Sequence, residues 1–114
     1  MSASDATHAH VQRMLDEIHQ HYTDRLNLAT LARTLGRQAA YLGRLFRAEV
    51  GATVHDYVTS LRIEHGASQV KSGVKIEAVA LCIGYRSKKN FYRQFKRRYG
   101  CTPEEYRLRQ REPV

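Results

Sequence analysis

Seven basic side chains are concentrated in a short stretch of the chain. They are Arg86, Lys88, Lys89, Arg93, Lys96, Arg97 and Arg98. No aspartate or glutamate lies between Ala78 and Pro103, so these cations have no acidic neighbour close in the sequence. Guanidinium and ammonium groups bind phosphate, and arginine can also form paired hydrogen bonds with a guanine edge. The stretch therefore indicates either a polyanionic partner or a strongly solvated face.

The apolar residues of this stretch show how its basic side chains are arranged. Phe91, Phe95 and Tyr99 recur every four residues, which places them along one side of a helix. Ser87 is suited to cap the start of this helix and Gly100 to end it, so we predict a helix over residues 88–99. The side chains left on its outward surface are Lys88, Lys89, Tyr92, Arg93 and Lys96.

The rest of the chain supplies the elements that hold this helix, and they are also predicted to be helical. Apolar residues repeat at spacings of three and four, and no stretch alternates as a strand would, so the predicted fold class is all-α. Asn27, Thr53 and Thr102 are the expected caps, and Pro103 with Glu105 strengthens the last helix start. The seven helices are predicted over about residues 7–22, 28–35, 38–50, 54–71, 76–83, 88–99 and 103–110.

Composition limits the class of protein and of partner. The chain has 114 residues, a net charge of +8 and 42% hydrophobic residues, which fits one soluble domain or two very small ones that bind DNA, RNA or an acidic membrane surface. No apolar run is long enough to span a bilayer, and the N-terminus does not read as a secretory signal. Cys82 lies in an apolar run and is expected to be a buried thiol, whereas Cys101 lies in a turn. Both fit a reduced, cytoplasmic protein.

An internal repeat relates the two halves of the chain. With a shift of 48 residues, Leu31, Ala32 and Gly36 fall on Val79, Ala80 and Gly84; with a shift of 49, Arg44, Phe46 and Gly51 fall on Arg93, Phe95 and Gly100. Each copy has a short helix, a turn opened by glycine and a second helix. This is the helix-turn-helix pattern, whose second helix enters the DNA major groove. The alternative is a generic α-hairpin repeat, but two copies are too few for a stable solenoid.

The second copy resembles the signature of the AraC/XylS family of bacterial transcription regulators. The resemblance covers about residues 8–108 and is most specific in the second half. It rests on the pattern Ile76-x-x-Val79-Ala80-x-x-x-Gly84-Tyr85-x-Ser87-x-x-x-Phe91-x-Arg93-x-Phe95-Lys96-x-x-x-Gly100-x-Thr102-Pro103-x-x-Tyr106-Arg107.

The resemblance implies two helix-turn-helix subdomains bridged by the long fourth helix, so that a monomer could read two successive major grooves. The expected organisation is a flexible N-terminus at 1–6, a first subdomain at 7–53, a linker helix at 54–71, a second subdomain at 72–110 and a tail at 111–114.

The resemblance and the exposed positions together predict the DNA contacts. Arg93 is the strongest candidate base reader, and Arg44 is its equivalent in the first copy. The predicted base contacts are Arg44, Ala40, Gly43, Lys88, Lys89, Asn90, Tyr92 and Arg93. The predicted phosphate contacts are Arg37, Arg47, Arg86, Lys96 and Arg97. For Asn90 a plain role at the helix start is an equal alternative, and for Arg62 helix packing is an equal alternative to a DNA contact.

The first recognition helix is the poorer of the two. Ala39, Ala40 and Gly43 stand where longer side chains would reach a groove, although alanine can contact a thymine methyl group. Gln38 replaces the serine or threonine that usually caps this helix in the family. Residues 27–58 carry four basic and two acidic side chains, against eight and three in residues 75–106. We therefore expect the second copy to dominate binding.

Other chemistries find little support. Four histidines form two pairs, His8 with His10 and His19 with His21. The two members of each pair are two residues apart, which places them on different sides of a helix, so no metal site is predicted. No nucleophile–base arrangement and no phosphate-binding glycine loop is present, so no enzyme activity and no cofactor are expected.

The sequence thus predicts a sequence-specific regulator that binds double-stranded DNA. The family resemblance favours activation over repression, a monomer, RNA polymerase as a second partner, and a cytoplasmic location on the nucleoid. Three alternatives stay open: a weakly specific architectural DNA-binding protein, a protein-interaction module that docks RNA polymerase and needs DNA only weakly, and the C-terminal DNA-binding part of a larger effector-responsive regulator. Met1 fits a complete small regulator equally well.

Overall fold

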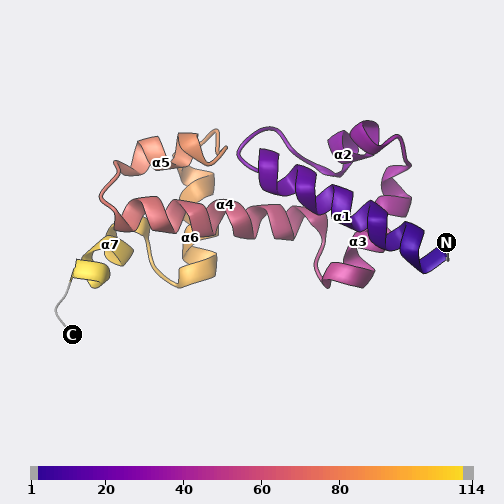
Figure 1. The fold of residues 1–114 in the computed structure, drawn as a ribbon. Coiled ribbons are helices and arrows are strands. Elements are labelled where there is room, and N and C mark those ends of the chain that lie inside the picture. Colours follow the sequence, from indigo (N-terminus) through magenta and orange to yellow (C-terminus); the bar gives the residue numbers. More distant parts are fainter. Residues whose placement is uncertain (1–2, 112–114) are drawn as a thin grey trace. The chain divides into compact units, whose positions relative to one another are not determined.

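The structure is a computed structural model that describes residues 3–111, and this part of the chain consists of seven α-helices joined by short turns (Figure 1). The helices are α1 (Ala3–His21), α2 (Leu28–Leu35), α3 (Ala39–Val50), α4 (Val54–Lys71), α5 (Ile76–Cys82), α6 (Lys88–Tyr99) and α7 (Pro103–Arg111). The predicted all-α class is confirmed. The predicted bounds of α2, α4 and α6 agree with the structure at both ends.

The contacts between residues divide the chain into two compact units, and the boundary lies inside α4, between Val58 and Thr59. In the first unit α1 packs on α2 and α3, and α2 packs on α3 (Figure 1). The buried residues of this unit are Val11, Met14, Ile18, Leu31, Leu35, Leu42, Phe46, Val54 and Val58. They follow the three- and four-residue spacing of the sequence, so each helix turns its apolar side to one shared core.

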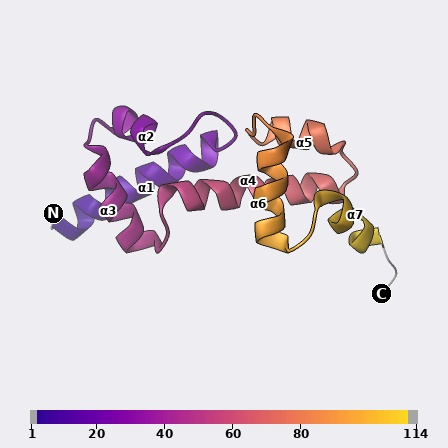
Figure 2. The ribbon, with the colours of Figure 1, turned by 180° about the vertical axis from the view of Figure 1, so that it is seen from behind.

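In the second unit α5, α6 and α7 gather around the greater part of α4. Figure 2 shows α6 crossing this part of α4, with α5 and α7 at either end of α6. The core combines Ile63, Ala67, Val70, Ile76, Val79, Ala80, Ile83, Tyr85, Phe91 and Phe95, and Tyr92, Tyr99 and Tyr106 pack against its margin. The predicted apolar stripe of α6 is therefore confirmed, with Phe91 and Phe95 fully buried.

The helices of the second unit approach each other closely at Gly66. A Cβ atom at this position would lie 2.8 Å from Cδ1 of Ile83 and 3.2 Å from Cε1 of Phe91. From the sequence alone Gly66 reads as a weak point of α4, because glycine inside a helix costs about 1 kcal/mol relative to alanine. In the structure its missing side chain is what lets the buried edge of α6 contact α4.

The helix ends follow the predicted local chemistry. Asn27 accepts the Thr30 N–H at 2.9 Å, and the Thr30 hydroxyl oxygen accepts the Asn27 N–H in return. Gly51 and Gly100 end α3 and α6 with φ angles of 86° and 76°, which residues other than glycine rarely adopt. The repeat in the sequence is thus a repeat of caps and stops as well as of apolar positions.

The start of α1 differs from the prediction. The helix begins at Ala3, whereas residues up to 6 were expected to be flexible and the helix was expected to start at residue 7. The first turn buries no large apolar side chain, so the periodicity gives no signal there, but Asp5 suits the positive end of a helix. Residues 1–2 and 112–114, which belong to the predicted flexible ends, lie outside the described residues.

The predicted environment of Cys82 is wrong. Cys82 is exposed, and it is Cys101 that is buried. Ile76, Val79 and Ala80 turn to the core from α5, and at 100° per residue Cys82 then projects away from it, together with Leu81. Not every residue of an apolar run on a short helix is therefore buried.

No helix among the described residues is long and apolar enough to cross a membrane.

Replacing Gly66 by alanine is expected to destabilise the protein even though alanine is the better helix former. The new methyl group forces Cδ1 of Ile83 to move and the Phe91 ring to give way by a few tenths of an ångström, and both side chains are fully buried. Overpacking of this kind costs about 1–3 kcal/mol, which equals or exceeds the gain in helix propensity of about 1 kcal/mol. Urea unfolding measures the change, and Ser68→Ala, an exposed substitution in the same helix, is the control. A Gly66→Ala protein as stable as the wild type would show that the contact is not tight.

Candidate nucleic-acid interface

The helix α6 is fixed at its start, along its buried side and at its end. The Ser87 hydroxyl accepts the Asn90 N–H at 3.2 Å, as predicted for a capping residue. Phe91 and Phe95 are inserted in the core, and Gly100 ends the helix. Because the buried side is fixed, the opposite side presents the same residues to the surroundings: Lys88, Lys89, Asn90, Arg93, Lys96 and Arg97 are all exposed.

The first outward stripe of α6, formed by Lys88 and Tyr92, is held by acidic side chains from the neighbouring helices. Lys88 Nζ donates to Oε1 of Glu77 on α5 at 2.8 Å and lies 5.3 Å from the centre of the Tyr92 ring. The Tyr92 hydroxyl donates to Oε1 of Glu104 on α7. Tyr92 is half-buried, which differs from the outward orientation expected from the sequence.

The titration behaviour of these groups reflects the same contacts. The hydrogen bond from Lys88 is the largest cause that lowers the pKa of Glu77, and the bond to Glu77 raises the pKa of Lys88. Burial, followed by the hydrogen bond to Glu104, raises the pKa of the Tyr92 hydroxyl far above its usual value. At neutral pH the stripe therefore consists of a paired lysine and a neutral tyrosine that donates to a carboxylate.

The second outward stripe, formed by Lys89 and Arg93, is not engaged in this way. The two residues are four apart and thus lie one above the other on the helix. Their side chains make no hydrogen bond or ion pair with any residue in the range 3–111. A lysine and an arginine with open hydrogen-bonding capacity on a rigid helix are suited to bind phosphate oxygens or the O6 and N7 atoms of guanine.

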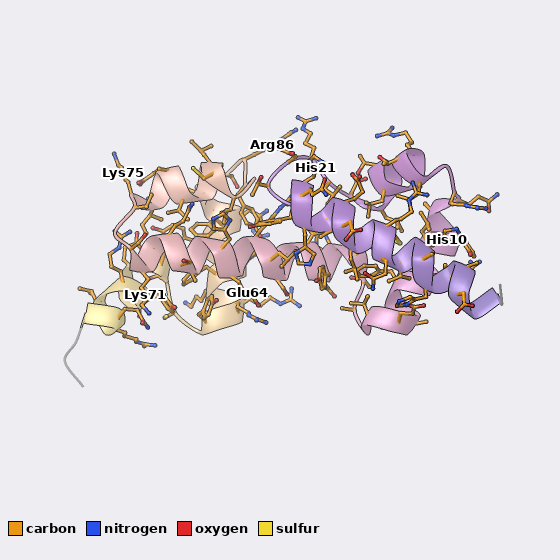
Figure 3. The ribbon with its side chains drawn as sticks, viewed as in Figure 1. His10, His21, Glu64, Lys71, Lys75 and Arg86 are labelled. Carbon is orange, nitrogen blue, oxygen red and sulfur yellow. The ribbon has the colours of Figure 1, made fainter. Side chains whose placement is uncertain are left out.

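The other predicted contacts of the second unit lie around α6. Arg86 is in the turn between α5 and α6 and is exposed (Figure 3). Arg97 is exposed on the last turn of α6, and Lys96 beside it acts electrostatically on Glu105 of α7. Arg98 points to the other side, where it donates to Oε1 of Glu64 on α4 at 2.6 Å. Apart from Lys88 and Arg98, which are paired with carboxylates, the basic run thus consists of exposed cations suited to phosphate.

In the first unit the predicted contacts gather at the start of α3. Arg37 and Arg44 line an open hollow together with Gly36, Gln38 and Tyr41. The Gln38 side chain makes no capping hydrogen bond, as expected from the sequence, so the first N–H groups of α3 are not satisfied by a cap. Two arginines beside free N–H groups form a local environment that favours an anion.

The remaining positions of α3 have little reach. Ala40 is exposed but short, and a Cβ atom at Gly43 would lie 3.1 Å from Cδ2 of Leu28, so α2 packs closely at this point. Arg47 is exposed on the last turn. The structure therefore keeps the asymmetry of the sequence, with one extended basic helix surface in α6 and one arginine pair at α3.

Arg62 and the histidines have contacts within the fold. Arg62 is half-buried, with its guanidinium carbon 5.9 Å from the centre of the Tyr85 ring, and burial lowers its pKa. This favours packing over DNA contact, the two readings left open by the sequence. Each histidine of the predicted pairs bonds to a different residue of the first unit: His8 to Glu49, His10 to Tyr41, His19 to Tyr57 and His21 to Asp24.

Glu77 and Glu104 are the residues of the candidate interface that the sequence did not predict. They are the acids that flank the acid-free stretch on either side, and both turn back onto α6. Glu77 is 11 residues before Lys88 and Glu104 is 12 residues after Tyr92, so each carboxylate comes from a helix other than α6. Pairing over such separations depends on how the helices pack, which periodicity does not determine.

Comparison with known proteins agrees with this architecture. A family model described as a helix-turn-helix domain matches residues 31–109. The regulatory protein SoxS of Escherichia coli K12 is 31% identical over 100 residues, which cover 87% of this chain and 94% of SoxS. The chain belongs to the AraC/XylS family of helix-turn-helix, DNA-binding transcription regulators.

Solved structures of family members superpose closely on this AraC/XylS chain. The C-terminal domain of AraT, a response regulator from Geobacillus stearothermophilus, has a TM-score of 0.85 and 29% identity, and the match covers 92% of this chain and 88% of that domain. A xylose-binding transcription activator, XylR, has a TM-score of 0.70 and 28% identity over 83% of this chain but only 25% of its own. The fold thus occurs both as nearly the whole of a small regulator and as part of longer ones.

Removing the Thr102 hydroxyl is expected to raise the pKa of Glu105. The Thr102 side chain and N–H both donate to Oε1 of Glu105, at 3.0 and 3.3 Å, and these bonds lower the pKa of that carboxyl. A lowered pKa means that the contribution to stability is present above the unfolded-state value of about 4.3 and is lost as the pH falls through the folded-state value. Thr102→Ala should raise the pKa of Glu105 towards its unfolded-state value, which a carbon-13 NMR titration measures.

Thr102→Ser, which keeps the hydroxyl, is the matched control and should retain the low pKa. If Glu105 titrates at the same pH in the wild type and in Thr102→Ala, the capping box at the start of α7 is not formed in solution.

Proposed function

We propose that this protein regulates transcription by binding a specific double-stranded DNA site. In the proposal, α3 and α6 enter successive major grooves, and α6 supplies most of the base discrimination. The observation that carries the proposal is the stripe of Lys89 and Arg93, which is exposed and unpaired within residues 3–111 on a helix whose other side is anchored in the core. Membership of a family of DNA-binding regulators supports a duplex as the partner.

The proposed contacts fall into two classes. Base edges are contacted by Lys89, Asn90 and Arg93 of α6 and by Arg44, Ala40 and Gly43 of α3; Lys88 and Tyr92 join them only where they leave Glu77 and Glu104. Backbone phosphates are bound by Arg37, Arg47, Arg86, Lys96 and Arg97. Phosphate contacts set register and salt dependence, whereas base contacts discriminate between sequences.

Further parts of the proposal rest on the family. We propose activation rather than repression, which the transcription activator XylR among the similar structures supports. RNA polymerase is then the second macromolecular partner. A monomer that acts on the nucleoid in the cytoplasm completes the proposal.

A specific observation favours a second candidate, a weakly specific architectural DNA-binding protein. The start of α3 offers only Arg37 and Arg44 as long cationic side chains. Ala40 and Gly43 have no polar side-chain group that could form a hydrogen bond with a base. Such a protein would bind through phosphates and would lose affinity uniformly when any cation is removed. The match to part of XylR supports a further version, in which this domain acts within a longer regulator.

Replacing Arg93 by alanine distinguishes recognition of a base sequence from purely electrostatic binding to DNA. With a site selected from a random duplex pool, Arg93→Ala is expected to lose about 1–3 kcal/mol of discrimination at one base pair, because a bidentate contact to guanine has no replacement. Affinities for the selected duplex and for its single-base variants, measured by fluorescence anisotropy, give this quantity.

The control is Arg97→Ala, a change of the same chemistry on the last turn of α6. It should weaken all duplexes about equally and reduce the salt slope by about 0.9. If Arg93→Ala also weakens every duplex equally, the protein does not read sequence through this arginine, and the architectural alternative holds.

A further inference from the structure

Two carboxylates lie beside the cationic surface of α6, and both bind side chains that the sequence predicts to face DNA. Glu77 accepts a hydrogen bond from Lys88, and Glu104 accepts one from Tyr92. The Lys88 ammonium also rests on the Tyr92 ring, so the four residues form one connected group across α5, α6 and α7. Two of the five side chains predicted to face outward from α6 are thus engaged within the protein.

The group is accessible to a ligand. The side chains of Lys88 and Glu77 are 49% and 52% exposed, so water and ions reach the pair. A phosphate that approaches Lys88 meets the Glu77 carboxylate at 2.8 Å from the same nitrogen and is repelled by it. The phosphate must either displace Glu77 or share Lys88 with a like charge, and both weaken the contact.

The stripe of Lys89 and Arg93 has no such competitor. Across residues 3–111 neither side chain has an acidic partner, and both lie on the same helix as Lys88. The nearest comparable pair on α6, Arg98 with Glu64, has an N···O distance of 2.6 Å and similar exposure, but it involves α4 and the last turn of α6. It provides an internal reference for the effect of removing a carboxylate.

We propose that Glu77 is a positioning residue that competes with the DNA backbone for Lys88. Because Lys88 is held by Glu77 and supported by Tyr92, it makes no phosphate contact in the complex. The affinity for any duplex is therefore lower than it would be if every cation of α6 bound phosphate. Tyr92, bound to Glu104, supports Lys88 instead of reading a base. Base reading by α6 then falls to Lys89 and Arg93. The inference rests on the proposed function, because it requires α6 to lie against DNA.

The test compares salt dependence in the full chain. The variants are Glu77→Gln, Lys88→Gln, the double variant, and Glu64→Gln as the control for loss of one exposed carboxylate. Dissociation constants for the selected duplex and for an unrelated duplex are measured by fluorescence anisotropy between 50 and 300 mM KCl, with circular dichroism to verify that each variant folds.

We expect the salt dependence to change only when Glu77 is removed while Lys88 is present. Glu77→Gln should increase the magnitude of the salt slope by about 0.9, the value for one added phosphate contact, and should tighten both duplexes about five- to tenfold near 0.1 M salt. Lys88→Gln alone should leave the slope of the wild type unchanged, and the double variant should behave like Lys88→Gln. Glu64→Gln should change neither the slope nor the affinity by more than about twofold.

Three results would overturn the inference: an unchanged slope in Glu77→Gln, an equal increase in Glu64→Gln, or tightening by Glu77→Gln that persists without Lys88. Weaker binding by Glu77→Gln would also overturn it, since Glu77 would then orient Lys88 towards DNA. Failure of the proposed function looks different, because the wild type would then bind the selected and unrelated duplexes equally, whatever the slopes of the variants.

Discussion

The close contact between α4 and α6 at Gly66 is the constraint on which the second unit depends. Ile83 and Phe91 together occupy the space that a side chain at position 66 would take, and Phe95 continues the buried edge of α6. Truncation of a buried phenylalanine costs about 3–5 kcal/mol, whereas an exposed ion pair contributes at most about 1 kcal/mol. The core therefore determines the rotation of α6 about its axis, and the surface charges take the positions that remain.

This constraint connects packing to chemistry. With the phenylalanine edge fixed inward, Lys89 and Arg93 emerge on the far side of α6, while Lys88 and Tyr92 fall within reach of the helices on either side. The same basic helix thus carries an open stripe and an engaged stripe. The first unit follows the repeat in its core, but at α3 it offers only an arginine pair beside an uncapped helix start.

The sequence predicted most of the fold because local signals and apolar periodicity agree. Ser87 and Gly100 mark the ends of α6, Phe91 and Phe95 mark its inner side, and the structure confirms all four. The failures have a common physical origin. The start of α1 and the exposure of Cys82 lie where apolar spacing gives no signal or a misleading one. The partners of Lys88 and Tyr92 depend on the packing of three helices, which spacing along one helix does not determine.

In the proposed function, the exposed stripe of Lys89 and Arg93 on α6 reads a base sequence as well as attracting phosphate. The most direct measurement is the ratio of the wild-type dissociation constants for an unrelated duplex and for a duplex selected from a random pool, at physiological salt. We expect a ratio of about 10³ or more, with protection of the selected duplex confined to one or two helical turns. A ratio near one would contradict it.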